Sequence, residues 1–285
     1  MTTPRVPPEA EPDTPERVLR EASAGLMGLV HPEPLGDGRS GGGLDWEPLT
    51  TALVPGRLAE LVDRQIPRWS GAAPIVAASL LVREITGLVT TVAVDLWGRS
   101  RRVLDLSLDN LELACTADAT RLALRHAGLR TLPGDPATAR SDVAALPEHD
   151  LRTALLTTIL DGTIPTVVDS MQEVVRTGRR HLWGNVALGI ANGFTTVGHS
   201  HDGADEERRR FLAHRPELTR TIELLTVDDG LGGELTCALR RTCCLLDEVD
   251  PAYRCATCSL DHDPGRRERV VTHYVAERRA ARRVS

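Results

Sequence analysis

Four of the six cysteines lie within sixteen residues near the C-terminal end of the chain, and this cluster constrains the fold more than any other sequence feature. Cys243 and Cys244 are adjacent, and Cys255 and Cys258 follow with the spacing C-C-x10-C-x2-C. Two thiolates three positions apart can converge on one metal ion. Adjacent side chains diverge in regular structure, so both members of the first pair can be ligands only where the backbone is irregular. The polar, proline-containing segment between the pairs predicts such an irregular loop.

Several chemical interpretations fit these four cysteines. A structural zinc site normally uses two Cys-x2–4-Cys pairs, and the adjacent pair departs from that spacing. Residues 1–30 are rich in proline and acidic side chains and lack the layout of a secretory signal, so we expect a reducing compartment, which disfavours disulfides. Chance clustering of buried cysteines is a further alternative. We favour an iron–sulfur cluster, and the number of ligands leaves [2Fe–2S] and [4Fe–4S] both open.

The cysteine spacing resembles the C-terminal motif of the FhuF-like ferric-siderophore reductases. Two upstream segments also resemble this family: Leu182-Trp183-Gly184-Asn185 and, more weakly, the Ala-Ala-Ser-Leu-Leu sequence of residues 77–81. The resemblance therefore extends over residues 50–262. It implies an oxidoreductase that transfers one electron to siderophore-bound Fe(III) and releases Fe(II) for iron assimilation. It also implies a [2Fe–2S] cluster on four ligands: Cys243, Cys244, Cys255 and Cys258.

The partners of such a reductase follow from the same interpretation. The substrate would be a ferric siderophore, which we expect to be of the hydroxamate type. No flavin or nicotinamide site is evident, so electrons would come from a ferredoxin or a flavoprotein reductase. A literal G-x-G-x-x-G lies in the Gly-rich loop 36–43, but prolines precede it and we interpret it as a flexible loop. Two alternatives remain open: a zinc or iron–sulfur module acting as a sensor, and a redox relay in a biosynthetic pathway.

Three arginines adjoin the cysteines, namely Arg240, Arg241 and Arg254. They could donate hydrogen bonds to thiolate or sulfide and offset the negative charge of a cluster, which would raise its reduction potential. The alternative is that they form surface ion pairs with the acidic residues of 247–250.

Other side chains have weaker claims on a function. His199 and His201, with Asp202 and Asp205, could bind a metal, although a solvated polar loop is the simpler interpretation. Cys237 could serve as a replacement ligand, and we expect Cys115 to be a small core residue in a strand. Trp183 could pack against a siderophore or in the core, and Asn185 could bind a siderophore or make a core or capping hydrogen bond.

The remaining sequence predicts an α+β fold in which an antiparallel sheet packs with helices and the second half is helix-rich. We divide the chain into a disordered tail (1–15), an α+β domain (16–236), a cluster-binding module of the same domain (237–262) and a basic C-terminal tail (263–285). We expect helices at 16–29, 55–64, 75–91 (where Gly87 bends or ends the helix), 148–160, 164–180, 182–194, 206–214 and 217–226. We expect strands at 92–96, 103–108 and 111–115, with 121–129 forming a strand or a short helix.

Charge and hydropathy limit the partners further. The 34 basic and 40 acidic residues give a net charge of −6, which argues against a nucleic-acid partner. Every basic residue is Arg, so no Schiff-base or P-loop lysine exists. We expect no transmembrane segment and a cytoplasmic location, with peripheral contact at the inner face of the membrane as an open alternative. Residues 266–285 hold seven Arg and two Glu, a net +5, so this tail is either a docking surface or a solvated helix with Val271, Tyr274 and Val275 on its buried side.

Overall fold

The computed structural model describes residues 14–23, 30–32, 34–35, 44–198, 203–229, 232–250, 255, 257–260 and 264–282. The first thirteen residues of the expected tail, the Gly-rich loop 36–43 and the His199–Asp202 segment lie outside these ranges, as does Arg254. Pro15, the last residue of the expected tail, is already the first residue of a helix.

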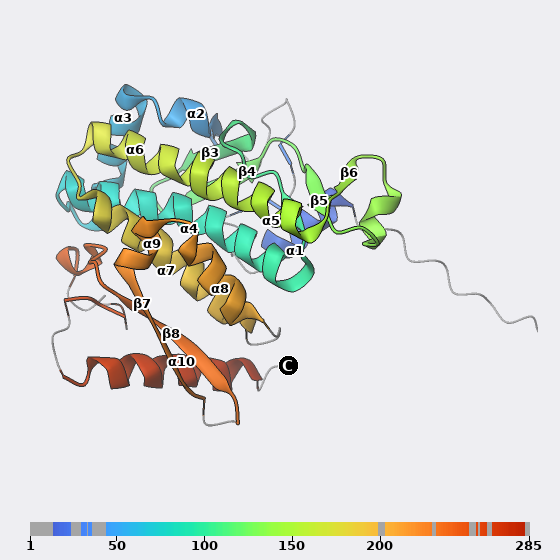
Figure 1. Cartoon of the computed structure of the whole chain (residues 1–285). Coiled ribbons are helices and arrows are strands. Elements are labelled where there is room, and N and C mark those ends of the chain that lie inside the picture. Colours follow the sequence, from blue (N-terminus) through green and yellow to red (C-terminus); the bar gives the residue numbers. More distant parts are fainter. Residues whose placement is uncertain are drawn as a thin grey trace, which may run out of the picture.

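The long helix α4 (Pro74–Ser100) is the centre of the fold, and α7 (Arg179–Gly198) packs along it (Figure 1). Most of α4 is apolar and buried on several faces, as expected of a core helix. The two helices approach closely because small residues face the partner helix. A Cβ placed on Gly98 would lie 2.5 Å from a methyl carbon of Val197. This close contact lies at the C-terminal ends of both helices.

The predicted end of a helix near residue 91 and the predicted strand 92–96 are both wrong, because this whole stretch belongs to α4. Valine and threonine favour strands, and their density here made the sequence pattern misleading. Tertiary burial overrides that preference. The hydroxyls of Thr86 and Thr90 donate to the carbonyl oxygens of Val82 and Thr86 one turn earlier, so their polar groups are satisfied within the helix.

By length and composition, α4 could span a membrane, and it is the one such helix among the described residues. In the fold, however, 72% of its most apolar window is buried by the rest of the chain. A core helix meets the same criteria of length and composition, so α4 carries no argument for a membrane location.

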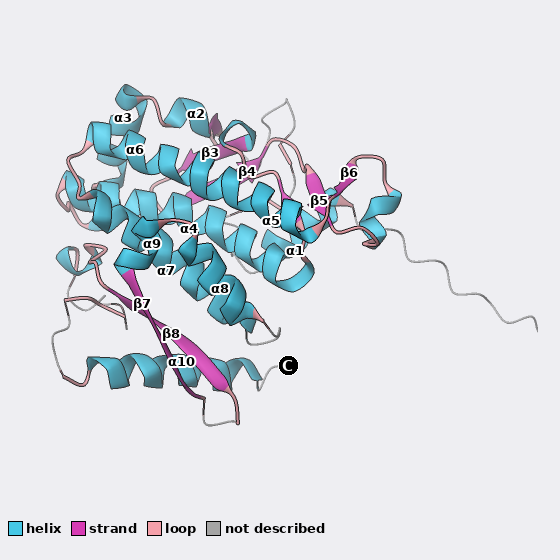
Figure 2. Cartoon of the chain, viewed as in Figure 1, coloured by secondary structure: helices cyan, strands magenta, loops and turns pink. Residues whose placement is uncertain are grey.

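Three small sheets pack against the helices (Figure 2), and they confirm the α+β fold class with antiparallel sheets packed with helices. In the first, β1 (Glu47–Pro48), β3 (Leu111–Cys115) and β4 (Thr120–Leu124) are antiparallel in the order β1-β3-β4. In the second, β2 (Val103–Leu104) pairs antiparallel with β5 (Leu129–Thr131), which pairs parallel with β6 (Val143–Ala145). In the third, β7 (Ile222–Asp228) and β8 (Glu234–Arg240) form a hairpin.

The predicted strand at 111–115 is confirmed, and the segment 121–129 contributes to two strands of different sheets. The predicted strand 103–108 is shorter than expected because β2 pairs with β5 only at Val103 and Leu104, and a 3-10 turn, η4 (Leu108–Asn110), begins where the strand was expected to end. The remaining helical elements are α1 (Pro15–Ser23), α2 (Leu49–Ala52), α3 (Pro55–Gln65), η3 (Pro67–Trp69), η5 (Pro136–Ala139), α5 (Glu148–Leu156), the π-helical η6 (Thr157–Thr163), α6 (Ile164–Val174), α8 (Ala204–Ala213), α9 (Pro216–Thr221), η7 (Leu246–Glu248) and α10 (Arg266–Arg282).

The β7–β8 hairpin was not predicted. The expected helix 217–226 ends at Thr221, where β7 takes over. The hairpin lies between the helical layer formed by α7, α8 and α9 and the C-terminal helix α10 (Figure 1). Its position matters because β8 leads directly into the first cysteine pair.

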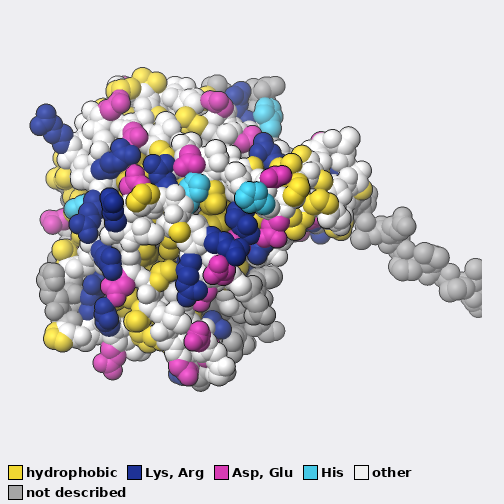
Figure 3. Space-filling view, viewed as in Figure 1, with side chains coloured by type: hydrophobic (Ala, Val, Ile, Leu, Met, Phe, Trp, Pro, Cys, Tyr) yellow, Lys and Arg dark blue, Asp and Glu magenta, His cyan; other side chains and the backbone are white. Residues whose placement is uncertain are grey.

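Helix α10 occupies most of the expected basic tail and belongs to the folded core. Val270 and Tyr274 are buried, and Val271 and Val275 pack partly buried against the same core. The interpretation of this segment as a helix with one buried side is therefore confirmed, with Val270 as an additional core residue. Its charges are partly used within the chain, since Arg267 pairs with Glu223. On the face in Figure 3, arginine and acidic side chains are interspersed.

Candidate metal centre

Strand β8 delivers the first two cysteines to one end of the hairpin. Its last residue, Arg240, is in register with Ile222, and the Arg241 N–H donates to the Thr221 carbonyl oxygen. The strand ends there, so Cys243 and Cys244 follow in irregular backbone. Leu245, the next residue, has a φ of 66°. This left-handed conformation reverses the chain directly after the pair, and the irregularity that adjacent ligands require is present.

The four cysteines line one small cavity, together with Arg240 and Thr242. Cys244 and Cys258 are buried, whereas Cys243 and Cys255 are half-buried. The second pair is held in a turn in which the Cys258 N–H donates to the Cys255 carbonyl oxygen at 2.9 Å. The structure thus brings together all four cysteines that the sequence singled out. Over the described residues, no group of three or more His, Cys, Asp or Glu side chains stands at metal-binding geometry, so the thiols surround the cavity without converging on one point.

Cys244 and Cys255 share a proton across this cavity. A hydrogen bond from the Cys255 thiol lowers the pKa of Cys244 to about 5, and the positive charge of Arg240 acts in the same direction. The same hydrogen bond, with burial, raises the pKa of Cys255. Burial also raises the pKa of Cys243. One thiolate is therefore present at neutral pH, and further thiols must lose protons when a metal binds.

Arg240 is the basic residue of this cavity, whose lining also includes the acidic residue Asp247. Its side chain is only 2% exposed, and it donates to the Asn185 amide oxygen and to the Thr242 carbonyl oxygen. Within the described residues, no carboxylate lies within ion-pairing distance of its guanidinium. A buried cation is costly unless a negative charge compensates it. The four-thiol cavity that it lines is the place where such a charge would stand.

Two segments far upstream in the sequence hold this region in place. The Ser79 hydroxyl of α4 donates to the Cys244 carbonyl oxygen at 3.1 Å. The Asn185 amide of α7 donates to the Ser79 carbonyl oxygen at 3.2 Å, while its own oxygen accepts from Arg240. Both segments of the weaker family resemblance therefore contact the cysteine module. Asn185 makes the core hydrogen bonds that formed one of its two sequence interpretations.

Gly184 and Thr242 fix the distance between α7 and the cysteine loop. A Cβ on Gly184 would lie 1.7 Å from the Thr242 hydroxyl oxygen, so no side chain fits there. That hydroxyl is buried and has no hydrogen-bond partner among the described residues. Thr242 lines the cavity, but this hydroxyl lies against Gly184. Trp183 is fully buried in the core and packs under the Arg215 guanidinium, at 4.9 Å from the ring centroid.

The first residue of α10 contacts the site from the side opposite α4 and α7. The Arg266 guanidinium donates to the Arg240 carbonyl oxygen at 2.7 Å and to the Thr257 carbonyl oxygen at 3.3 Å. One side chain thus ties the end of β8 to the turn of the second cysteine pair. Neither Arg266 nor Thr242 was singled out in the sequence. Thr242 could have been noticed from its position immediately before the adjacent pair, whereas nothing in the sequence pointed to Arg266.

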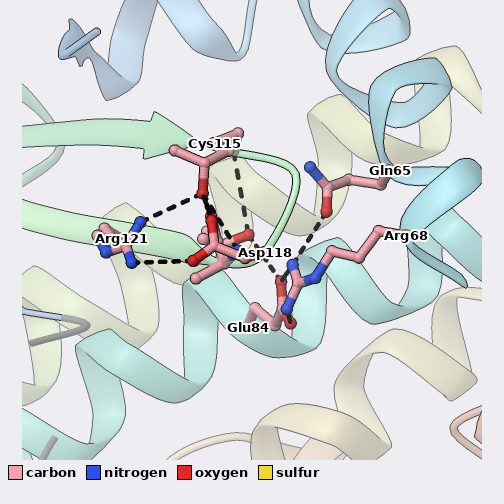
Figure 4. Close-up of polar contacts among 9 residues, drawn as sticks. Gln65, Arg68, Glu84, Cys115, Asp118 and Arg121 are labelled. Carbon is pink, nitrogen blue, oxygen red and sulfur yellow. Dashed lines mark hydrogen bonds and ion pairs between the residues drawn. The ribbon is translucent and has the colours of Figure 1, made fainter. Parts of the chain in front are cut away.

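The remaining candidates lie elsewhere. Arg241 is half-exposed and faces Glu223 at 3.7 Å, which is a surface ion pair with a different acidic residue from those expected. Cys237 is fully buried within β8, and burial raises its pKa to about 11. Cys115 ends β3 beside Thr120, away from the cavity, and burial raises its pKa to about 11 (Figure 4). Its interpretation as a packing residue in a strand agrees with this position.

The donor set fits a tetrathiolate metal centre. Four thiolate ligands suit an iron–sulfur cluster or a zinc ion. In either case the thiolates and the bound group together have a net negative charge. The buried Arg240, which has no carboxylate partner among the described residues and lowers the pKa of Cys244, matches an anionic group in the cavity. No protein-family model matches the chain, and no curated protein matches it.

Proposed function

We propose that this chain is a ferric-siderophore reductase that holds a [2Fe–2S] cluster on Cys243, Cys244, Cys255 and Cys258. The observation that carries the proposal is the shared cavity of these four thiols with Arg240 in its wall. The family resemblance of the motif supports iron–sulfur over zinc. The convergence of Ser79 and Asn185 on the same loop supports it further, because those residues belong to the segments that resemble the family.

When bound, such a cluster supplies one electron to chelated Fe(III), having received one from a ferredoxin or a flavoprotein reductase, so that one Fe(II) forms per electron. Ferric iron is a hard cation held tightly by hydroxamate oxygens, whereas Fe(II) is held far more weakly. Reduction therefore labilises the complex, and protonation of the freed ligand oxygens favours release.

The residues around the cavity would tune this chemistry. Arg240 places a positive charge beside the thiolates, which favours the more negative, reduced state and raises the reduction potential. Ser79, Asn185 and Arg266 act on the backbone and on Arg240 and would position these groups. We place the protein in the cytoplasm, with peripheral membrane contact as an additional proposal.

A single-turnover experiment tests the proposed reaction. Anaerobically reduced protein is mixed with a ferric trihydroxamate in the presence of a ferrous-specific chromophoric chelator. We expect reoxidation of the protein and formation of one Fe(II) complex per electron held. A stable reduced protein with no Fe(II) formed would contradict the reductase and leave a sensor, or a relay with another acceptor.

A further inference from the structure

A second cavity, of about 230 Å³, adjoins the cysteine cavity and shares Cys255 with it. It is bordered by α4, α7 and α10, and Thr257 of the second cysteine pair also lines it. Its polar lining includes Asn192, Thr195 and Thr196 from α7. A molecule in this cavity would therefore contact the side chain of a proposed cluster ligand.

Arg83 is the basic residue in the wall of this cavity. It lies on α4, one helical turn after Ser79, and it also lines a third cavity, of about 340 Å³. Its side chain is half-buried, and no hydrogen bond or ion pair to it is found among the described residues. Both cavities thus include one arginine in their lining, and its five N–H donors find no acceptor in the described part of the chain.

Arg68 and Glu84, the other charged groups of the third cavity, are already engaged with partners in the chain. In the third cavity, Arg68 binds Glu84 at 2.6 Å and also donates to the Gln65 side-chain oxygen (Figure 4). Glu84 additionally accepts from the Thr120 hydroxyl at 2.6 Å. In the second cavity, Glu277 lies 3.3 Å from His273 on α10. Arg83 therefore stands out as a guanidinium directed to no protein acceptor in the described structure.

The chemistry of the cavity indicates the class of ligand. A guanidinium recognises negatively charged or strongly polarised oxygens, and hydroxyl and amide groups add hydrogen bonds. A ferric hydroxamate presents such oxygens on its outer surface, since each iron-bound N–O⁻ and C=O oxygen keeps lone pairs. The second cavity alone is small for a whole chelate, but the third cavity on the other side of Arg83 extends the space along α4.

We propose that the iron chelate docks against Arg83 in the cavity that shares Cys255 with the metal centre, and that Arg83 donates hydrogen bonds to its iron-bound oxygens. This inference rests on the proposed function. One electron would leave through the Cys255 side and reduce the docked Fe(III) to Fe(II), and the external protein donor would then replace that electron. Arg83 touches the substrate oxygens, whereas Cys255 provides the shortest contact between substrate and ligand set.

Arg83→Gln tests the site, with Arg83→Lys as a variant that keeps the charge and loses the guanidinium fork. Arg64→Gln is the matched control, because Arg64 is an exposed arginine on α3 that lines neither cavity. Cluster-loaded protein is titrated calorimetrically with a gallium(III) trihydroxamate, which has the shape of the ferric complex and accepts no electron. Single-turnover oxidation by the ferric trihydroxamate is measured on the same samples.

We expect Arg83→Gln to weaken binding of the gallium chelate by about tenfold or more, as for loss of a charge-assisted hydrogen bond. Arg83→Lys should be intermediate and Arg64→Gln should bind as the wild type does. Equal affinity in Arg83→Gln and wild type, with oxidation by the ferric chelate intact, would overturn the docking site and leave the reductase standing. Arg83-dependent binding of the gallium chelate without any oxidation of wild-type protein would support the site and contradict the proposed reaction. Absence of both binding and oxidation in the wild type would overturn both.

Discussion

The Ser79 hydroxyl donates a hydrogen bond to the carbonyl oxygen of Cys244, 3.1 Å away, although 165 positions separate the two residues. The bond joins the central helix to the loop that carries the first cysteine pair. Because both partners are buried, the loop is anchored to the core of the protein. The arrangement of the four cysteines therefore depends on residues outside the cysteine motif.

Ser79→Ala should weaken that anchor. The substitution leaves the Cys244 carbonyl oxygen without its donor, and a buried unsatisfied group costs about 1–3 kcal/mol. We expect a corresponding loss in the free energy of unfolding and faster release of the bound metal to a chelator. Thr91→Ala is the control, since the Thr91 hydroxyl bonds only within α4, to the Gly87 carbonyl oxygen. Equal rates of metal release from the two variants would argue against a positioning role for Ser79.

Gly184→Ala should be far more damaging than its size suggests. The new methyl group would lie 1.7 Å from the Thr242 hydroxyl oxygen, so Thr242 and the adjoining Cys243 must move. Overpacking of this kind costs about 1–3 kcal/mol or more, and we expect incomplete metal loading. Gly87→Ala, in the interior of α4, meets no atom within 4 Å and should be neutral or slightly stabilising. Thermal unfolding and metal content of both variants are the measurements, and normal loading of Gly184→Ala would count against the packing argument.

Arg240→Gln should lower the reduction potential of the loaded protein. Removing a buried positive charge beside the thiolates disfavours the extra electron, and the shift should be on the order of tens of millivolts. Arg241→Gln removes the same charge from a half-exposed residue that faces Glu223, so its effect should be smaller. Potentiometric titration compares the two. If Arg241→Gln shifted the potential as much as Arg240→Gln, the buried position of Arg240 beside the cysteines would not be what controls the reduction potential.

The metal-free protein should hold a thiolate at neutral pH. The Cys244 pKa of about 5 lies below the ordinary thiol value, so its thiolate persists above that pH and is lost as the pH falls through about 5. Ultraviolet thiolate absorbance of metal-free protein would follow this titration. Cys244→Ser should abolish the signal, because it removes the thiolate itself. Cys237→Ser should leave it unchanged, because the pKa of Cys237 is raised to about 11. An unchanged signal in Cys244→Ser would reassign the thiolate.

The sequence predicted the grouping of the four cysteines better than their surroundings. The cysteine spacing is local information, and the structure places all four thiols on one cavity. Arg240 could be noticed because it is close to the cysteines in sequence. Arg266 and Arg83 could not be noticed in this way, since they come close to the cysteines only when α10 and α4 pack in the folded chain.

The helices and strands were likewise predicted well where local sequence determines them and poorly where tertiary packing does. Helix α3 was predicted almost residue for residue because Pro55 marks its start and its apolar residues repeat with a helical period. The β-rich composition of residues 92–96 was overridden by the packing of α4 on α7. The β7–β8 hairpin was missed because Leu224 and Thr226 fit a helix as well as a strand when their partner strand is unknown.

The most direct test of the four-cysteine centre is the anaerobic spectrum of purified protein, with iron, acid-labile sulfide and zinc determined on the same sample. We predict a red-brown protein with about two irons and two sulfides per chain. Single Cys→Ser changes at 243, 244, 255 or 258 should lose or disturb that spectrum, whereas Cys115→Ser should keep it. A colourless protein with about one zinc per chain, still free of iron after attempted reconstitution, would contradict the reductase and identify a structural or sensory zinc module.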